Sequence, residues 1–480
     1  MPCRPDLLIR LLFAAICALA SCTFAADIST RLPPAVAEAL AQAGIPEGSV
    51  GIYVQDTQAS RPLLAIGEER AFNPASTIKL LTTFSALEQL GPAYQWTTEI
   101  YADGALDGDV LNGNLVMKGG GDPRLTLENF WLMLRNLRAR GVREIRGDLV
   151  LDRSYFARDE TDPAEFDNEP TRPYNTPPDA LLVNFKALRL QFVPDTQRQA
   201  LRILSEPALQ QVQILNNVTL DNEPCGDWVN RLKLTALGDR ASARLLFAGN
   251  YSIACGDKER NYSVLGHAQY VHGLFSLLWR ELGGTFSGGV RDAVVPAGAR
   301  LLVSHQTQSL AEIARDINKF SNNVMARQLY LALGAITLGA PASTEKSARS
   351  IKQWLTVQRL AMPELALENG SGLSRVERIS AKSLAQLLLT AQHSAVMPEF
   401  IASLPLVAVD GTMKKRLTGA DIAGQAHIKT GSLTGVRAIA GYVFDAKGRT
   451  LIVVCLINHP RAQSALAAQD ALLTWAYRRP

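Results

Sequence analysis

The chain has 480 residues, of which 47% are hydrophobic and 20% are charged. A chain of this length can bury a large core and exceeds the usual size of one domain, so we expect a globular protein of more than one part. Its 49 basic and 45 acidic residues give a net charge of +4 and are spread along the chain without a long basic run. This pattern argues against a nucleic acid as a partner.

The first 26 residues have the pattern of an export signal. A basic start precedes an apolar stretch at 11–20, and small residues follow near Ala25. We therefore expect a periplasmic protein from which residues 1–26 are removed. A lipoprotein cleavage box ending at Cys22 is the less favoured alternative, because Cys22 lies so close to the Ala-x-Ala-like end. No later segment has the roughly 18 apolar residues of a spanning helix, so the mature chain should be soluble unless it is lipidated.

After the signal, the pattern predicts a short helix at 34–43, strands at 50–55 and 63–66, and a longer helix at 76–90. Apolar residues cover nearly the whole circumference of the helix at 76–90. Such a helix is typical of a buried core position rather than of a surface.

Residues 96–296 have a different sequence pattern, which predicts short strands, turns and polar loops. We interpret them as an inserted region, made of two nested subdomains, within a domain formed by 27–95 and 297–480. A faint repeat supports nesting: helices at 130–140 and 273–282 each lead through glycine into a strand. The hypothesis is that these two units pack in one subdomain whose middle is another insertion.

Three cysteines follow the signal region. Cys225 and Cys255 lie in loop-like sequence, each followed by Gly-Asp, and could form a disulfide in an oxidising compartment. Cys455 lies in an apolar strand and is interpreted as a buried, unreactive thiol.

The last third of the chain combines helices with strands. A capping box at Ser309–Glu312 opens a helix at 310–317. Further helices are predicted from about 321, at 344–360, 381–392 and 463–477, and strands at 427–431, 438–444 and 450–458. Helices before an antiparallel meander, with a terminal helix to cover it, predict an α+β domain.

Ser76 and Lys79 could supply a nucleophile and its base. On a helix, their spacing places the hydroxyl and the amine on one face, and burial favours the neutral lysine that a base requires. The pair alone is a weak indication, because Ser343 and Lys346 repeat the spacing. The helix after Ser343 has few apolar positions, so we interpret Ser343 as an N-cap.

The segment Ser321-Asn322-Asn323 lies between two predicted helices. From a loop it could direct a hydroxyl and an amide into a cleft between the helices. Taken alone, it is more typical of a helix cap followed by a turn.

The segment Lys429-Thr430-Gly431 ends an alternating strand and is followed by Ser432. The lysine and threonine can bind a carboxylate, the glycine lets a ligand approach the backbone, and a strand N–H can stabilise an oxyanion. Taken alone, the segment fits a charged strand end with a glycine turn equally well.

The chain resembles penicillin-binding proteins and serine β-lactamases in carrying three motifs in this order: Ser76-x-x-Lys79, Ser321-x-Asn323 and Lys429-Thr430-Gly431. The 245 residues from the first to the second serine exceed the spacing in compact β-lactamases. They favour the class C low-molecular-mass penicillin-binding proteins, the D-alanyl-D-alanine carboxypeptidase/endopeptidases of peptidase family S13. The resemblance covers nearly the whole mature chain. It implies an α+β transpeptidase fold, an antiparallel sheet flanked by helices, with large inserted β-rich subdomains.

The resemblance implies a serine carboxypeptidase, with DD-endopeptidase activity, that cleaves peptidoglycan stem peptides and cross-links and is acylated by β-lactam antibiotics. Ser76 would attack the D-Ala carbonyl with Lys79 as base. Ser321 would relay the proton to the leaving group, and Asn323 would hold the substrate amide.

The remaining roles concern substrate binding. Lys429 and Thr430 would bind the terminal carboxylate beside Gly431, and the N–H groups of Ser76 and Ser432 would form the oxyanion hole.

In this family an aspartate and an aromatic residue of the inserted region, with an arginine after a Gly-Ser-Gly-Leu-Ser run, bind the diamino-acid side chain of the stem. The best matches are Asp152, Phe156 and Arg375. Arg375 follows an intact motif, whereas Asp152 could equally be a turn residue at a strand end.

Two other functions compete with this interpretation. A β-lactamase would share the acylation chemistry, but no deacylating glutamate is evident after Asn323. A non-catalytic peptidoglycan-binding protein could keep the fold. We expect no cofactor and no metal, since His267 and His272 lack a ligand spacing. Peripheral membrane association and a homodimer stay open.

Overall fold

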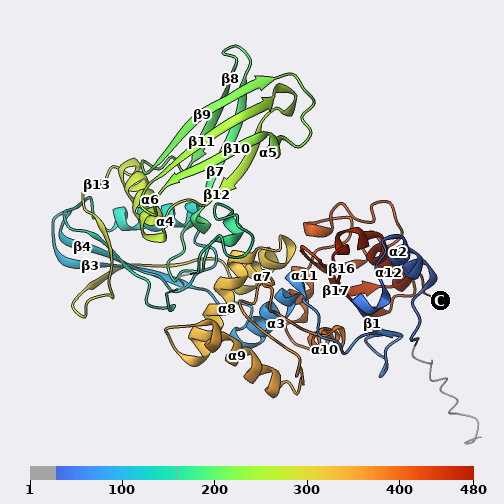
Figure 1. The fold of residues 1–480 in the computed structure, drawn as a ribbon. Helices are drawn as coiled ribbons and strands as arrows, with labels where there is room; N and C mark the ends of the chain where they lie inside the picture. Colours follow the sequence, from blue (N-terminus) through green and yellow to red (C-terminus); the bar gives the residue numbers. More distant parts are fainter. Residues whose placement is uncertain (1–28, 159–160, 480) are drawn as a thin grey trace, which may run out of the picture.

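The computed structural model describes residues 29–158 and 161–479. The predicted export signal, including Cys22, lies outside the described residues. Two parts are visible in Figure 1, where both ends of the chain, blue and orange to red, form one part. The segment between them, cyan to yellow, forms the other. Among the described helices, none combines the length and the apolarity needed to cross a membrane.

The first part is built on a five-stranded antiparallel sheet in the order β16-β17-β18-β1-β2. Its strands are β1 (Val50–Asp56), β2 (Leu64–Ile66), β16 (Ala426–Leu433), β17 (Val436–Phe444) and β18 (Thr450–Asn458). The central strand β18 pairs with β1, so the two ends of the chain meet in one sheet. The predicted α+β arrangement is confirmed.

Helices cover both faces of this sheet. One face packs against α2 (Pro34–Gln42) and α12 (Leu466–Arg478), and the other packs against a group of six helices. The six are α3 (Lys79–Leu90), α7 (Leu310–Lys319), α8 (Asn323–Leu338), α9 (Thr344–Val357), α10 (Ala381–Gln392) and α11 (Met397–Ser403). Side chains along β17 point alternately to the two faces of the sheet. Ala440 and Tyr442 face the six helices, and Ile439 and Val443 face α2 and α12.

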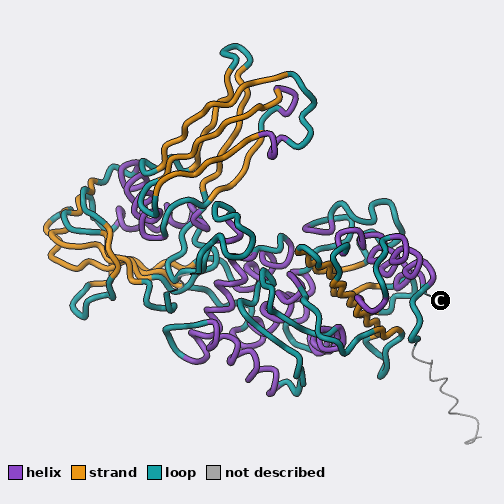
Figure 2. Tube along the Cα trace, viewed as in Figure 1, coloured by secondary structure: helices purple, strands orange, loops and turns teal. Residues whose placement is uncertain are grey.

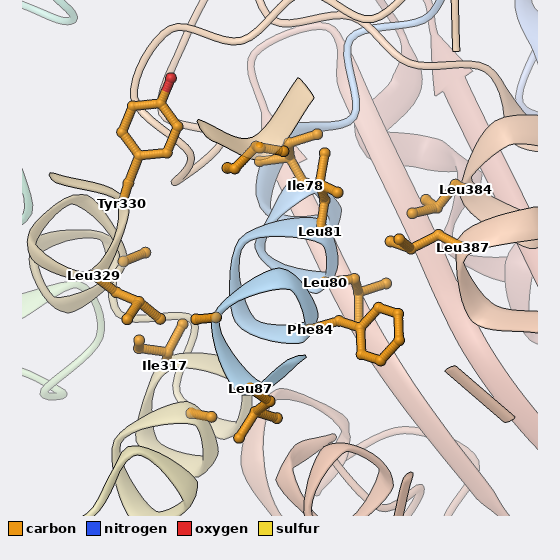
Figure 3. Close-up of a cluster of buried hydrophobic side chains, with 14 of the residues drawn as sticks. Ile78, Leu80, Leu81, Phe84, Leu87, Ile317, Leu329, Tyr330, Leu384 and Leu387 are labelled. Atoms are coloured by element: carbon orange, nitrogen blue, oxygen red, sulfur yellow. The ribbon is translucent and has the colours of Figure 1, made fainter. Parts of the chain in front are cut away.

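Helix α3 lies in the centre of the six helices. Figure 3 shows Leu80, Leu81, Phe84 and Leu87 of this helix directed toward neighbouring elements on several sides. All residues from Lys79 to Leu87 are buried, which confirms the prediction from its all-round apolar sequence. The start differs: a 3-10 turn, η2 (Ala75–Ile78), carries Ser76, and the α-helix begins at Lys79.

The second part contains a seven-stranded sheet in which β13-β5-β4-β3-β15 follow one another, with β6 and β14 paired beside β4. Its elements are β3 (Thr97–Asp107), β4 (Val110–Lys118), α4 (Leu127–Ala139), β5 (Glu144–Ile145), β6 (Leu149–Asp152), α6 (His267–Glu281), β13 (Thr285–Phe286), β14 (Val290–Asp292) and β15 (Arg300–Gln306). Because β15 pairs with β3, this part extends beyond the predicted boundary at residue 296.

The two helix-glycine-strand units pack in one sheet, as the faint repeat predicted. Strand β13 pairs in parallel with β5, and β14 pairs in parallel with β6. The residues between the units form a further module of two three-stranded sheets, β12-β7-β8 and β10-β11-β9. Figure 2 shows its orange strands extending away from the helix-rich first part. The strands are β7 (Leu188–Asp195), β8 (Ala200–Glu206), β9 (Val212–Asp221), β10 (Leu232–Gly238), β11 (Ala243–Ser252) and β12 (Lys258–Tyr262).

A disulfide joins Cys225 and Cys255 in this module, with their Cα atoms 4.7 Å apart. It connects the loop before the short helix α5 (Trp228–Arg231) to the turn that follows β11. Cys455 is a buried free thiol in β18, and burial raises its pKa to about 12. Its predicted inertness is consistent with this environment, since the thiolate is the reactive form.

Candidate active site

The turn that carries Ser76 is fixed to the end of strand β18. Asn73 donates from its backbone N–H to Asn458 Oδ1 at 2.7 Å, and its own Oδ1 accepts from the backbone N–H of Ala75 at 2.9 Å. Ala75 has φ = 44°, a left-handed conformation that is rare for a residue with a side chain. These hydrogen bonds hold the strained backbone of Ala75 directly before Ser76. Ser76 itself lies in the turn that precedes the α-helix.

Lys79 lies beneath Ser76 and is fully buried. Its Nζ donates to Ser76 Oγ at 2.9 Å and to Asn323 Oδ1 at 2.6 Å, and it also contacts the backbone carbonyl of Ser371. Burial, and then the positive charge of Lys429, hold the pKa of Lys79 well below its usual value. The geometry suits a neutral amine that accepts a proton from the serine hydroxyl.

The second motif lies where α7 ends and α8 begins. Ser321 has φ = 55°, and Asn322 caps α8 by accepting from the backbone N–H of Met325 at 3.1 Å. The cap that the sequence suggested is therefore Asn322, which leaves the Ser321 hydroxyl free to face β16. Asn323 begins α8 and brings its amide oxygen to Lys79.

Lys429 on β16 completes the hydrogen-bonded group. Its fully buried Nζ donates to Ser321 Oγ at 2.9 Å and to the Thr430 carbonyl at 2.8 Å. Burial lowers the pKa of Lys429 to about 7. The Thr430 hydroxyl donates to Thr412 Oγ1 at 2.8 Å at an exposed position. A cation and a hydroxyl thus lie together on one strand, as carboxylate binding requires.

Strand β16 passes close to the serine turn at Gly431. A Cβ atom at this position would lie 2.8 Å from the Pro74 carbonyl oxygen and 3.0 Å from the backbone nitrogen of Ser76. Only glycine permits this approach. It brings the backbone of the following residue, Ser432, beside the amide of Ser76, the arrangement expected of two oxyanion-hole donors.

A buried carboxylate that sequence reasoning missed organises the loop facing Lys79. Glu377 accepts backbone N–H groups of 368–370 on one oxygen, at 2.8–3.2 Å, and that of Gly372 on the other at 3.0 Å. Burial raises its pKa, although the four N–H donors oppose this change. Since both oxygens accept hydrogen bonds, the ionised form fits the site. The sequence Arg375-Val376-Glu377-Arg378 around it gives no local indication of this role.

The second Ser-x-x-Lys pair has the structural role that its sequence context predicted. Ser343 Oγ accepts from the backbone N–H of Lys346 at 3.3 Å and caps α9. The Lys346 ammonium donates to the carbonyls of Gly339 and Pro341 instead of to the serine. The N-cap interpretation is confirmed.

A cavity of about 370 Å³ opens beside the loop that Glu377 holds. Arg375 lines it, with its guanidinium carbon 4.7 Å from the centroid of the Phe166 ring. Asp162 and Glu165 also line it. The cavity combines a cation, carboxylates and an aromatic face.

Asp152 and Phe156 do not line this cavity. Asp152 is 2% exposed and accepts from the N–H and hydroxyl of Ser154 and from the N–H of Val295, so it stabilises a turn at the end of β6. Phe156 is 4% exposed and belongs to the core cluster of the helices. The family resemblance suggested these two residues, whereas the loop at 161–178 reaches Arg375 and supplies Asp162 and Phe166.

Among residues 29–158 and 161–479, no group of three or more His, Cys, Asp or Glu side chains is arranged to hold a metal ion. His272 is on α6, where its Nε2 lies 3.1 Å from the Gly288 carbonyl oxygen. The active-site group described above consists of hydroxyl, amine and amide groups.

Comparisons with known proteins agree with this geometry. Residues 32–479 match the D-Ala-D-Ala carboxypeptidase 3 (S13) family. The chain is 25% identical over 417 residues to the D-alanyl-D-alanine carboxypeptidase DacB of Haemophilus influenzae, covering 86% of each chain. It is 27% identical over 452 residues to the D-alanyl-D-alanine carboxypeptidase of Actinomadura sp., covering 89% of this chain and 81% of the relative.

The fold also matches a solved structure. The crystal structure of penicillin binding protein 4 (dacB) from Haemophilus influenzae aligns with a TM-score of 0.77 at 24% identity, over 91% of this chain and 99% of that chain. Sequence and fold comparisons thus cover the sheet domain together with the inserted part. The chain belongs to the D-Ala-D-Ala carboxypeptidase 3 (S13) family.

Proposed function

We propose that this protein is a serine-type D-Ala-D-Ala carboxypeptidase, with DD-endopeptidase activity, that acts on peptidoglycan peptides. The observation that carries the proposal is the fully buried Lys79, with its Nζ 2.9 Å from Ser76 Oγ and its pKa well below the usual value. A neutral amine in contact with a serine hydroxyl can activate it without histidine or metal.

Acylation begins when Lys79 takes the proton of Ser76 Oγ and the oxygen attacks the carbonyl carbon of the penultimate D-Ala. The N–H groups of Ser76 and Ser432 stabilise the oxyanion. The tetrahedral intermediate then expels the terminal amine, which receives a proton through the Ser321 hydroxyl beside Lys429. Water hydrolyses the resulting acyl-Ser76 ester and regenerates the serine.

Substrate orientation follows from the groups around the serine. Lys429 and Thr430 hold the terminal carboxylate beside Gly431, while Asn323 holds the substrate amide. Arg375 binds the diamino-acid side chain of the stem in the adjacent cavity. There, Asp162 and Phe166 take the places that the sequence analysis assigned to Asp152 and Phe156.

A matched pair of substitutions tests the nucleophile. Ser76→Ala should abolish release of D-Ala from a stem peptide and formation of a covalent adduct with labelled penicillin, a loss of at least about a thousandfold. Ser343→Ala alters the second Ser-x-x-Lys pair and should leave both activities intact. Unchanged hydrolysis in Ser76→Ala would show that the catalytic assignment is wrong.

The fate of the penicillin adduct separates the peptidase from a β-lactamase. A stable, slowly lost adduct supports the peptidase, and rapid turnover of the drug contradicts it. Incubation with cross-linked muropeptides, followed by mass analysis of the products, measures carboxypeptidase against endopeptidase activity.

The proposed location is the periplasm, reached through the N-terminal export signal. The disulfide between Cys225 and Cys255 supports an oxidising compartment, because such bonds do not persist in a reducing cytosol. N-terminal sequencing of the mature protein would test cleavage near residue 26.

A further inference from the structure

A second cavity, of about 560 Å³, lies next to the one that Arg375 lines. The two cavities share Thr161, Pro163 and Pro177 as lining residues. The second cavity continues between the turn after β10, the start of α6 and strand β14. We call it the basic cavity, after Arg153, Arg158, Lys186, Arg240 and Arg291 in its lining. A ligand that leaves the cavity lined by Arg375 along the 161–178 loop therefore meets it next.

Lys186 lines the basic cavity and is unusual in being a buried lysine without a side-chain partner among the described residues. The residue is only 8% exposed, and within the described part of the chain its ammonium has no hydrogen-bond or ion-pair partner, although its backbone N–H donates to the Val183 carbonyl. Burial and the charge of Arg240 lower its pKa to about 8. A largely buried lysine without a charged partner is destabilised in its charged form, and an anion in the cavity would stabilise that form.

The backbone holds Lys186 in this position. Asn184, Phe185 and Lys186 have φ values of 48°, 53° and 52°, three left-handed residues in succession. Tyr270 locks the turn from α6, because its hydroxyl accepts from Asn184 Nδ2 at 2.9 Å and donates to the Ala187 carbonyl at 2.7 Å. The lysine is thus fixed by surrounding structure rather than placed by a flexible loop.

The carboxylates that line the basic cavity already have other partners. Asp179 and Asp292 pair with Arg153 at 2.5 and 2.7 Å. Asp239 accepts backbone N–H groups of its own turn, at 2.7 Å from Ala241 and 2.9 Å from Ser242. Within the described part of the chain, Lys186 and Arg240 have no carboxylate in an ion pair, so the cavity offers two cations to a ligand.

We propose that the basic cavity binds a carboxylate of a second peptide stem in cross-linked peptidoglycan, while the first stem occupies the active site. This rests on the proposed function, because it deepens the substrate assignment of that site. Stem peptides carry side-chain and terminal carboxylates, which Lys186 and Arg240 would bind through charge-assisted hydrogen bonds. The shared wall of the two cavities places one stem beside the other.

Three substrates test the proposal: a cross-linked muropeptide with free carboxylates on its second stem, the same muropeptide with those carboxylates amidated, and a short acetylated tripeptide ending in D-Ala-D-Ala. Lys186→Met should raise KM for the first about tenfold or more, from loss of one charge-assisted hydrogen bond. It should leave KM for the other two substrates, kcat, and acylation by labelled penicillin unchanged. Arg240→Gln should act in the same direction.

Lys447→Met is the matched control, since Lys447 is exposed in the turn between β17 and β18. It should change none of these values. The melting temperature of Lys186→Met should stay equal or rise, because the substitution removes an unpaired buried charge. Equal KM values for the acidic and amidated muropeptides in the native protein would overturn the proposal, as would a parallel loss with the tripeptide. Failure of the proposed function would instead appear as absent D-Ala release in the native protein.

Discussion

At the scale of single residues, the site contains two buried lysines that need opposite protonation states. In the proposed mechanism, Lys79 must be neutral to accept the proton of Ser76, and Lys429 must be charged to hold a carboxylate. Both are fully buried, and burial lowers the pKa of each. Each lysine also contacts a serine hydroxyl, at 2.9 Å in both cases. Because one lysine must be neutral and the other charged, the pH dependence of the reaction tests both roles.

The pH profile of kcat/KM for D-Ala release should be bell-shaped. On the acid side, activity rises as Lys79 loses its proton, and its lowered pKa places this rise well below the range of a free lysine. On the alkaline side, activity falls as Lys429, with its pKa of about 7, loses the charge that binds the carboxylate. A bound carboxylate restores that charge, so kcat at saturating substrate should lack the alkaline fall. A flat kcat/KM between about pH 7 and 9 would contradict the role of Lys429.

Glu377 is predicted to position the loop that contacts Lys79. In Glu377→Gln the amide nitrogen cannot accept a hydrogen bond, so at least one N–H group of residues 368–372 loses its acceptor. We expect the free energy of unfolding to fall by about 1–3 kcal/mol and kcat/KM to fall about tenfold. Loss of the negative charge should also move the acid limb of the profile to lower pH, because Glu377 raises the pKa of Lys79.

Glu345→Gln, at an exposed position in the first turn of α9, is the control for this substitution. It should alter neither the acid limb nor acylation. A role of Glu377 in folding alone would lower the melting temperature while leaving the acid limb unmoved.

At the scale of elements, the site forms where three pieces of secondary structure end against one another. The turn η2 carries Ser76, the start of α8 carries Asn323, and the edge strand β16 carries Lys429. The edge position of β16 matters. Residues 405–407 pair with its outer side over residues 426–428, and beyond them, within the described part of the chain, the strand has no outer neighbour and can bind an extended peptide. One proposed oxyanion donor, Ser76, lies on η2 and the other, Ser432, lies on β16. The distance between β16 and η2 therefore determines the distance between the two donors.

Gly431→Ala tests this separation. The added Cβ would lie 2.8 Å from the Pro74 carbonyl oxygen, so β16 must move away from Ser76. We expect the rate of acylation by labelled penicillin to fall about tenfold to a hundredfold, since a displaced oxyanion donor costs about this much or more. Gly48→Ala is the control, because no atom lies within 4 Å of its Cβ position. Equal acylation rates for the two variants would refute the close approach.

At the scale of the whole molecule, the inserted part is a separate body that still supplies residues to the site. Its core cluster is distinct from the two clusters that flank the five-stranded sheet. The 161–178 loop crosses from this part to Arg375, and Gln328 on α8 binds the backbone of Asp179 in both directions, at 2.9 and 2.8 Å. In the proposed mechanism, the inserted part thus adds residues for substrate recognition to a chemical site that lies in the first part.

Removing the disulfide of the module of two three-stranded sheets tests whether the two parts of the fold are independent. Replacing Cys225 and Cys255 by serine removes a crosslink across 30 residues, which should lower the free energy of unfolding of the module by about 3–4 kcal/mol. Acylation of Ser76 by labelled penicillin should be unchanged, because neither cysteine contacts the five-stranded sheet domain. Thermal unfolding followed with and without reductant measures the first effect. A parallel loss of acylation would show that the two parts fold as one unit.

The sequence by itself indicated the elements, because these depend on local patterns, and it proposed the catalytic residues through the order of three motifs that resemble those of a known family. The all-round apolar helix after Ser76 and the capping box at Ser309 were predicted from the order of residues. The two helix-glycine-strand units were expected to pack in one subdomain, and the structure pairs β13 with β5. The tertiary structure decided which distant segments meet. It placed Phe166 rather than Phe156 against Arg375 and brought the Glu377 carboxylate under the loop facing Lys79. The contact of Phe166 with Arg375 joins distant parts of the chain, and the packing of the inserted part against the helices fixes it. Glu377 binds a loop only five to nine residues away, but the contact of that loop with Lys79 depends on the fold.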